Sequence, residues 1–166
     1  MKLYLIRHAE AIERCAGVRE EDRWLTPKGR EGFRESARRL AKKGEIPAVI
    51  ATSPLVRAVQ TAEILAEVLD FGGELCVSRE LAPGFSVEGL LRLAQACGMP
   101  RSLAVVGHEP DLGEVLGRLL GRGGALPLKK GMMVALKLEA AEGAMSARFR
   151  WLIQDGRKQR AFPEDG

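Results

Sequence analysis

Residues 2–8 read KLYLIRH, in which four strongly apolar residues are followed at once by Arg7 and His8. A short apolar run of this kind predicts a buried strand that delivers polar side chains at its carboxyl end. The run is too short for the core of a signal peptide or for a membrane span. We therefore expect a first strand over residues 2–6, no membrane contact and a cytoplasmic location.

Strand and helix patterns alternate along the rest of the chain. Short apolar runs predict strands over residues 48–51, 75–77, 103–106, 133–138 and 147–153. Apolar residues at helical spacing predict helices over residues 27–43, 55–69, 87–96 and 112–120. This order is typical of a sheet that is covered by helices on both faces and binds ligands at the carboxyl ends of its strands. We expect an α/β protein, a three-layer α/β/α sandwich with a mostly parallel central sheet.

Two Ser/Thr-Pro pairs mark the starts of the first two predicted helices. Thr26 is the expected N-cap of the first helix, with Pro27 in its first turn, and the Ser53-Pro54 pair repeats this signal. The polar stretch 10–24 has no sustained period, which indicates a loop long enough to line a site.

The length of 166 residues fits one domain, 1–166, in which residues 154–166 form a tail beyond the last predicted strand. The tail contains the basic run RKQR at 157–160, which either docks an acidic partner or, as most such runs do, simply faces solvent.

The net charge of +4 raises nucleic acid as a partner. Most basic residues over 28–43, however, interleave with acidic ones in the manner of a solvated helix face, so we expect no nucleic-acid partner. The three cysteines (Cys15, Cys76 and Cys97) are widely spaced and form no C-x-x-C pair. They suggest neither a disulfide framework nor a zinc site, which fits a reducing compartment.

Both histidines of the chain, His8 and His108, directly follow apolar strands. One histidine in such a place is more often structural, but two at carboxyl strand ends together favour function. Arg7 lies beside His8, and Arg57 lies near a helix start just past another strand end. Surface arginines are common. A guanidinium at this edge, however, would bind two oxygens of a phosphate group at once. The four side chains predict an anion site.

Four motifs carry a resemblance to the histidine phosphatase superfamily, the phosphoglycerate-mutase-like proteins. They are LIRHAEA at 5–11, LTPKGR at 25–30, TSPLVRAVQTA at 52–62 and VVGHEP at 105–110. Four motifs in the right order are specific, whereas Arg-His alone would be worthless. Ala9 replaces the usual glycine of the first motif, a change that would matter if that position needed a positive φ.

The resemblance implies a role for each residue of the anion site. His8 resembles the nucleophile, whose neutral imidazole attacks phosphorus and forms a phosphohistidine that water hydrolyses. Arg7, Arg57 and His108 would bind the phosphoryl oxygens, His108 as an imidazolium stabilised by the bound dianion. No cofactor is implied, and two histidines without an ordered set of carboxylates make a poor metal site, so we expect no metal.

Two carboxylates compete for the general acid that protonates the leaving group. Glu80, just after the third predicted strand, resembles the acidic position of the mutase-like branch, whereas Glu109 follows His108 as an aspartate does in the acid-phosphatase branch. We prefer Glu80, although either residue could be an ordinary exposed glutamate.

Only 50 residues separate Arg57 from His108, and the predicted elements fill them, so no lid subdomain fits. An open site suits a phosphate carried on a protein, and the motif set resembles short phosphohistidine phosphatases of the SixA type, which act on phosphohistidine in signalling proteins. The alternatives are a phosphatase of small phosphate esters, a mutase, which needs a closed pocket, and a non-catalytic phosphoprotein-binding module. A pure binder needs no nucleophile, so His8 favours an enzyme.

Overall fold

The KLYLIRH stretch forms β1 (Lys2–Arg7) near the middle of a seven-stranded sheet. The structure is a computed structural model that describes residues 1–141 and 144–162. The other strands are β2 (Val49–Thr52), β3 (Glu74–Val77), β4 (Ser102–Gly107), β5 (Met133–Ala141), β6 (Ala144–Gln154) and β7 (Arg157–Gln159). The helices are α1 (Pro27–Ala41), α2 (Val56–Val68), α3 (Val87–Ala96) and α4 (Asp111–Leu119), with short 3-10 helices η1 (Glu20–Asp22) and η2 (Arg79–Leu81).

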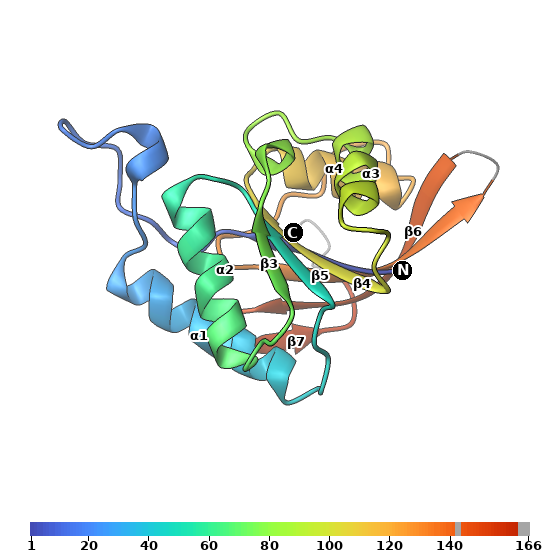
Figure 1. Cartoon of the computed structure of the whole chain (residues 1–166), viewed down its shortest axis with the longest axis horizontal. Helices are drawn as coiled ribbons and strands as arrows, with labels where there is room; N and C mark the ends of the chain where they lie inside the picture. Colours follow the sequence, from blue (N-terminus) through green and yellow to red (C-terminus); the bar gives the residue numbers. More distant parts are fainter. Residues whose placement is uncertain (142–143, 163–166) are drawn as a thin grey trace.

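The sheet has the order β3-β2-β4-β1-β5-β6-β7 (Figure 1). The strands from β3 to β1 pair in parallel, and those from β1 to β7 pair in antiparallel fashion. The predicted α/β class is therefore confirmed, with the parallel part of the sheet on one side of β1. Because β1, β2 and β4 are parallel neighbours, their carboxyl ends meet at one edge.

The side chains of β1 alternate between two hydrophobic cores, one on each face of the sheet. Leu3 and Leu5 pack with residues of α3 and α4, whereas Tyr4 and Ile6 pack with residues of α1 and α2. This alternation follows from the pleat of a strand, which sends successive side chains to opposite faces. The result is the expected three-layer α/β/α sandwich, with α1 and α2 on one face and α3 and α4 on the other (Figure 1).

The predicted cap of the first helix is confirmed, whereas the Ser53 cap predicted for the second helix is wrong, although α2 starts within one residue of its predicted position. The Thr26 hydroxyl accepts a hydrogen bond from the Gly29 N–H (2.9 Å), as an N-cap does. Ser53, in contrast, lies two residues before Leu55, the observed N-cap of α2. Its hydroxyl accepts a hydrogen bond from the Leu55 N–H (3.2 Å) and also contacts His108. Ser53 therefore stabilises the turn before α2 and holds the ring of His108 in place.

The segment predicted as a tail contributes a strand to the sheet. β6 continues to Gln154, and β7 pairs with it through a two-residue turn at Asp155-Gly156. Both turn residues have positive φ (50° and 69°), the geometry for which Asp-Gly is favoured in tight hairpins. The basic run therefore lies partly in an edge strand.

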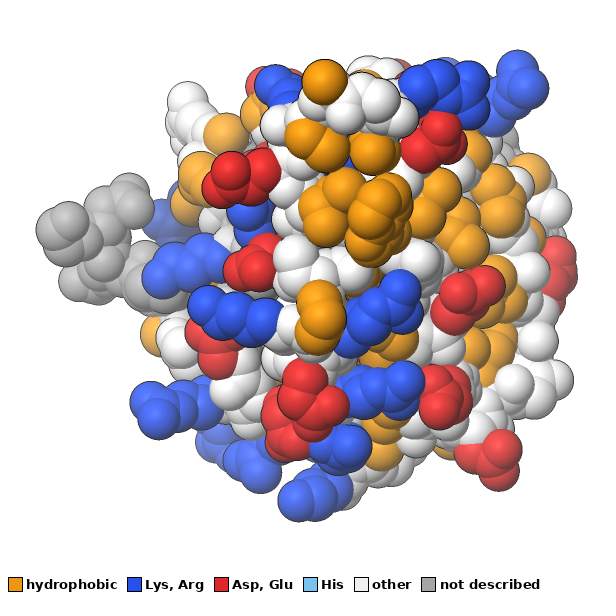
Figure 2. Space-filling model, turned by 90° about the vertical axis from the view of Figure 1, so that its left-hand side faces the viewer, with side chains coloured by type: hydrophobic (Ala, Val, Ile, Leu, Met, Phe, Trp, Pro, Cys, Tyr) orange, Lys and Arg blue, Asp and Glu red, His pale blue; other side chains and the backbone are white. Residues whose placement is uncertain are grey.

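Charges of both signs alternate on the face formed by the 10–24 loop, α1 and α2 (Figure 2). Arg34 of α1 pairs with Glu67 of α2 (3.0 Å), and Arg38 pairs with Glu31 (3.3 Å) and with Glu35. The interleaved basic residues thus form local ion pairs, as expected of a solvated face. Among the described residues, no helix is long and apolar enough to span a membrane.

Candidate active site

A basic cavity of about 490 Å³ opens at the carboxyl ends of β1 and β4, beside the start of α2. Four of the five predicted site residues meet there; Glu80 is absent from its lining. The cavity is lined by Arg7, His8, Ala11, Glu13, Arg14, Glu20, Arg23, Arg57, His108, Glu109 and Lys130. The predicted anion site therefore exists as a geometric unit.

The contacts of His8 show which of its two ring nitrogens carries the proton. Its Nδ1 lies 2.7 Å from the Ala9 carbonyl oxygen, which can only accept, so that Nδ1 carries the proton. Its Nε2 accepts a hydrogen bond from the Arg57 Nε–H (3.3 Å), which requires that Nε2 be unprotonated. Burial lowers the pKa of His8 to about 3, and His108, Arg57 and Arg7 add to the effect. The imidazole is therefore neutral at pH 7, with its lone pair on Nε2.

His108 lies beside His8, with ring centroids 5.3 Å apart. Its Nε2 is 2.7 Å from the Ser53 hydroxyl, and its buried Nδ1 has no partner among the described residues. Burial, followed by the charge of Arg57, lowers the pKa of His108 to about 4. His108 is thus neutral at pH 7, and the predicted imidazolium would require an anion to raise its pKa.

Arg57 is only 5% exposed and connects several parts of the site. Besides Nε on His8, its Nη1 donates to the Glu20 carbonyl (2.8 Å) and its Nη2 to the Glu20 carboxylate (3.1 Å). Thr61, one turn further along α2, donates to the Arg57 carbonyl (2.7 Å) and accepts from the Ala9 N–H (3.0 Å). Thr61 thereby fixes the start of α2 against the segment that follows His8.

Arg7 is the last residue of β1 and directly precedes His8. Its Nη1 donates to the Leu128 carbonyl (2.8 Å), while its buried Nε has no partner among the described residues. Buried donors without partners are costly and are common at functional sites. Ala9 is absent from the described residues with positive φ, so alanine in place of glycine introduces no strain.

The preferred acid, Glu80, lies outside the basic cavity. Its two carboxylate oxygens accept from Nε and Nη2 of Arg92, both at 2.9 Å, and this ion pair lowers the pKa of Glu80. Glu109 instead lines the cavity, where burial raises its pKa, partly offset by the Leu128 N–H and Arg7. Of the two predicted candidates for the acid, Glu80 and Glu109, only Glu109 lines the cavity that contains the histidines, so the geometry does not favour the predicted preference for Glu80.

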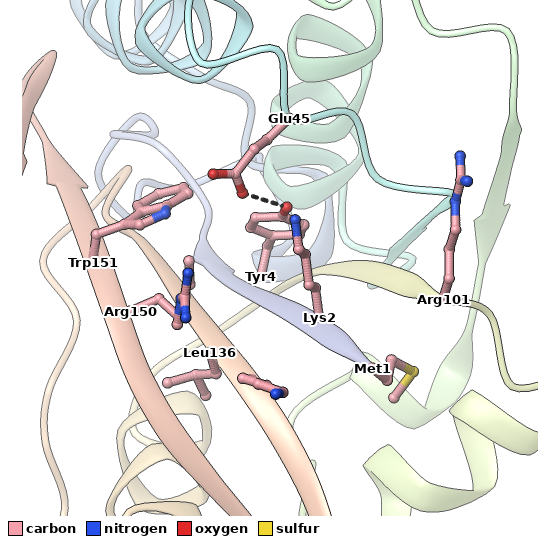
Figure 3. A pocket seen from close by; sticks show the side chains of 10 residues that line it. Met1, Lys2, Tyr4, Glu45, Arg101, Leu136, Arg150 and Trp151 are labelled. Carbon is pink, nitrogen blue, oxygen red and sulfur yellow. Dashed lines mark hydrogen bonds between the residues drawn. The ribbon is translucent and has the colours of Figure 1, made fainter.

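A second cavity, of about 320 Å³, lies at the amino end of β1 (Figure 3). Its centre is the Tyr4 hydroxyl, which donates to Glu45 (2.8 Å), and Lys2, Arg101 and Trp151 surround it. Neither histidine lines this cavity, so the phosphate chemistry belongs to the basic cavity at the other end of the strand.

Within the described residues, no group of three or more His, Cys, Asp or Glu side chains is placed to hold a metal ion. The expectation that the site works without a metal remains a prediction. The unprotonated His8 nitrogen, the guanidiniums and the half-buried carboxyl group are together the kinds of group that an enzyme of phosphoryl transfer needs.

The comparisons agree with this class. The family model of the histidine phosphatase superfamily (branch 1) matches residues 3–82. An uncharacterized protein of Picosynechococcus sp. (strain PCC 7002) is 39% identical over 145 residues, which cover 85% of this chain and 87% of the relative. The chain belongs to the histidine phosphatase superfamily, and it is accordingly an enzyme of the phosphatase class.

Two solved structures show the same fold. One is the protein histidine phosphatase SixA complexed with tungstate, with a TM-score of 0.81, 24% identity and coverage of 93% of this chain and 97% of that one. The other is the alpha-ribazole phosphatase from Shigella flexneri, with a TM-score of 0.69, 17% identity and full coverage of both chains (100%). The phosphoglycerate-mutase-like sandwich without a lid is therefore confirmed.

Proposed function

We propose that this protein removes phosphate from phosphohistidine on a signalling protein, through a covalent phosphohistidine on His8. The observation that carries the proposal is the state of His8: Nδ1 is held by the Ala9 carbonyl, and an unprotonated Nε2 belongs to a ring that lines the basic cavity. An unprotonated imidazole nitrogen that lines a basic cavity is equipped to attack phosphorus once it exchanges the Arg57 N–H for the phosphoryl group.

The residues around His8 supply what the transfer needs. Arg7 and Arg57 provide guanidinium donors for the phosphoryl oxygens, and His108 provides a third polar group. Burial, and after it the charges of Arg57 and Arg7, lower the pKa of His108; the charge of a bound dianion acts in the opposite direction and favours uptake of a proton by His108. Water then attacks the phosphohistidine, and phosphate leaves.

Glu109 is the proposed general acid. Its carboxyl group lines the same cavity as His8, and burial favours its protonated form. An imidazole leaves phosphorus more readily than an alkoxide does and needs less help from an acid. The contribution of Glu109 should therefore depend on the leaving group.

We expect Glu109→Gln to lower kcat for an alkyl phosphate by about a hundredfold, the usual contribution of a general acid. For a phosphohistidine substrate the loss should stay within about threefold, because the leaving imidazole asks less of an acid. Steady-state kinetics on both substrates checks this, with Glu80→Gln as the matched control. A large loss of kcat for the alkyl phosphate in Glu80→Gln, with no loss in Glu109→Gln, would identify Glu80 as the general acid.

The absence of a lid supports a phosphate carried on a protein. Between Arg57 and His108 the chain forms only the rest of α2, then β3, η2, α3 and β4, without an inserted subdomain. An open cavity admits a phosphorylated side chain that projects from a partner, whereas a closed pocket would exclude it. The protein histidine phosphatase SixA has the same fold.

A panel of phosphate donors tests the substrate. It should compare a phosphohistidine-bearing phosphotransfer protein, sugar phosphates, phosphoglycerates and nucleotides, each with and without a chelator. We expect kcat/KM for the phosphohistidine protein to exceed that of every small ester by at least about a hundredfold, a difference of about 3 kcal/mol, and to be unchanged by the chelator. Higher kcat/KM on a small ester would favour an ester phosphatase such as the Shigella flexneri neighbour. Loss of activity with chelator would refute metal independence.

A further inference from the structure

Glu20 places a carboxylate in the basic cavity, against the guanidinium that a phosphoryl group needs. Its Oε1 accepts from Nη2 of Arg57 (3.1 Å) and from Nη2 of Arg23 (2.7 Å). Its Oε2 accepts from Nε of Arg23 and Nε of Arg14, both at 3.0 Å. One carboxylate thus receives hydrogen bonds from three guanidiniums.

This arrangement resembles the way guanidiniums bind an oxyanion. Arginines form paired, charge-assisted hydrogen bonds to phosphate and to carboxylate with the same fork of N–H donors. Hydrogen bonds from Arg23, supported by Arg14 and by the charge of Arg57, lower the pKa of Glu20 to about 2. Glu20 is therefore ionised throughout the working pH range.

Glu20 occupies two of the five N–H donors of Arg57, one on each terminal nitrogen, and so competes with a substrate for this guanidinium. Three of its nitrogens already donate, Nε to His8, Nη1 to the Glu20 carbonyl and Nη2 to the Glu20 carboxylate. Arg57 itself is buried at the start of α2, whereas the Glu20 side chain is 42% exposed and stands on the three-residue turn η1. Of the two partners, Glu20 is the one that can leave toward solvent.

We propose that Glu20 is an internal competitor for the phosphate site, and that a phosphoryl group binds by displacing its carboxylate from Arg57 and Arg23. This inference rests on the proposed function, because it assigns the same cavity to the phosphoryl group. Glu20 then sets how tightly the site holds phosphate and favours release of the product. It is a positioning residue that acts through Arg57.

Displacement and simple repulsion predict different anion selectivity. If Glu20 leaves when an anion enters, the affinity of the site for the anion is multiplied by the fraction of time that Glu20 is away from Arg57. This factor is the same for anions of any charge. If Glu20 stays in place, its repulsion grows with the charge of the anion. Tungstate and perrhenate are tetrahedral oxyanions of similar size that carry two charges and one charge, so that the pair separates the two cases.

The experiment is calorimetric titration of the whole protein with tungstate, with perrhenate measured by competition. The variants are Glu20→Gln and Glu20→Ala, and thermal melts verify that they fold. Glu21→Gln is the matched control, because Glu21 lies in the same turn and pairs with Arg19 (3.4 Å), outside the basic cavity. We expect both Glu20 variants to bind each anion about tenfold more tightly, by equal factors, and the control to match the wild type.

Each other outcome contradicts one part of the account. Equal tungstate affinity in the wild type and the Glu20 variants, or weaker binding in the variants, would overturn the displacement while leaving the proposed function intact. A gain confined to tungstate would show that Glu20 repels anions without leaving, which also overturns it. Absence of tungstate binding in every variant and in the wild type would contradict the proposed function and the displacement together.

Discussion

His8→Asn is expected to lower kcat by at least about ten-thousand-fold, because loss of a covalent nucleophile leaves only binding and electrostatic effects. The change should spare the fold and the anion site, since Arg7, Arg57 and His108 remain to line the cavity. The test therefore compares the loss of kcat with the change in anion affinity in the same variant.

Steady-state kinetics on the best donor, with tungstate titration of the same preparation, measures both quantities. Cys76→Ala is the control, because Cys76 lies in β3 and does not line the basic cavity. A His8→Asn protein that still hydrolyses the donor within tenfold of the wild type would refute a nucleophilic role. A protein that binds phosphorylated partners but shows no turnover even as wild type would be a binding module.

The second large effect is on stability. His8 and His108 have folded-state pKa values near 3 and 4, below the value of about 6.5 for an unfolded histidine. Below that pH the unfolded chain binds more protons than the folded one, so that stability is lost as the pH falls. Each histidine should lower the free energy of unfolding by up to about 1.4 kcal/mol per pH unit until its folded-state pKa is reached.

Urea denaturation at pH 7, 6 and 5 checks this. The wild type should lose about 2 kcal/mol between pH 6 and pH 5 from the two histidines together. His8→Asn and His108→Asn should each lose about 1 kcal/mol less over the same interval, because one titrating group is gone while every carboxylate remains. Parallel losses in all three proteins would show that the histidines are charged or solvated in the folded state.

Much of the site could be predicted because its residues stand at strand ends. His8 and His108 follow β1 and β4, and the parallel pairing of these strands brings the two rings together without any special loop geometry. Arg7 shares the end of β1, and Arg57 lies in the first turn of α2, so the same rule placed them. Each of these positions depends on one local pattern and one topological rule.

The misplaced residues depend on contacts that no local pattern encodes. The Ser53-Pro54 pair predicts a helix cap, yet the Ser53 hydroxyl contacts His108, 55 residues away in sequence. Glu80 and Glu109 both follow strands, and only their surroundings separate them. The ion pair with Arg92 of α3 lowers the pKa of Glu80, whereas burial raises the pKa of Glu109 against the opposing charge of Arg7. Glu20 lies in a loop without periodicity, so its approach to Arg57 required the folded chain.

The hairpin at Asp155-Gly156, unlike these contacts, has a recognisable pattern in the sequence. Asp-Gly between two extended segments is a strong hairpin pattern, and the polar, basic residues after it masked the strand they form. An edge strand of this kind carries charges because one of its sides faces solvent.

The central claim is that phosphate passes through His8, and trapping the intermediate tests it most directly. The wild type is mixed with a radiolabelled phosphohistidine donor, quenched within milliseconds in alkaline detergent, and digested for peptide mapping. We predict a base-stable, acid-labile label on the peptide that contains His8, present in Cys76→Ala and absent in His8→Asn. A wild type that turns over without any such label, or a label that persists in His8→Asn, would contradict the account.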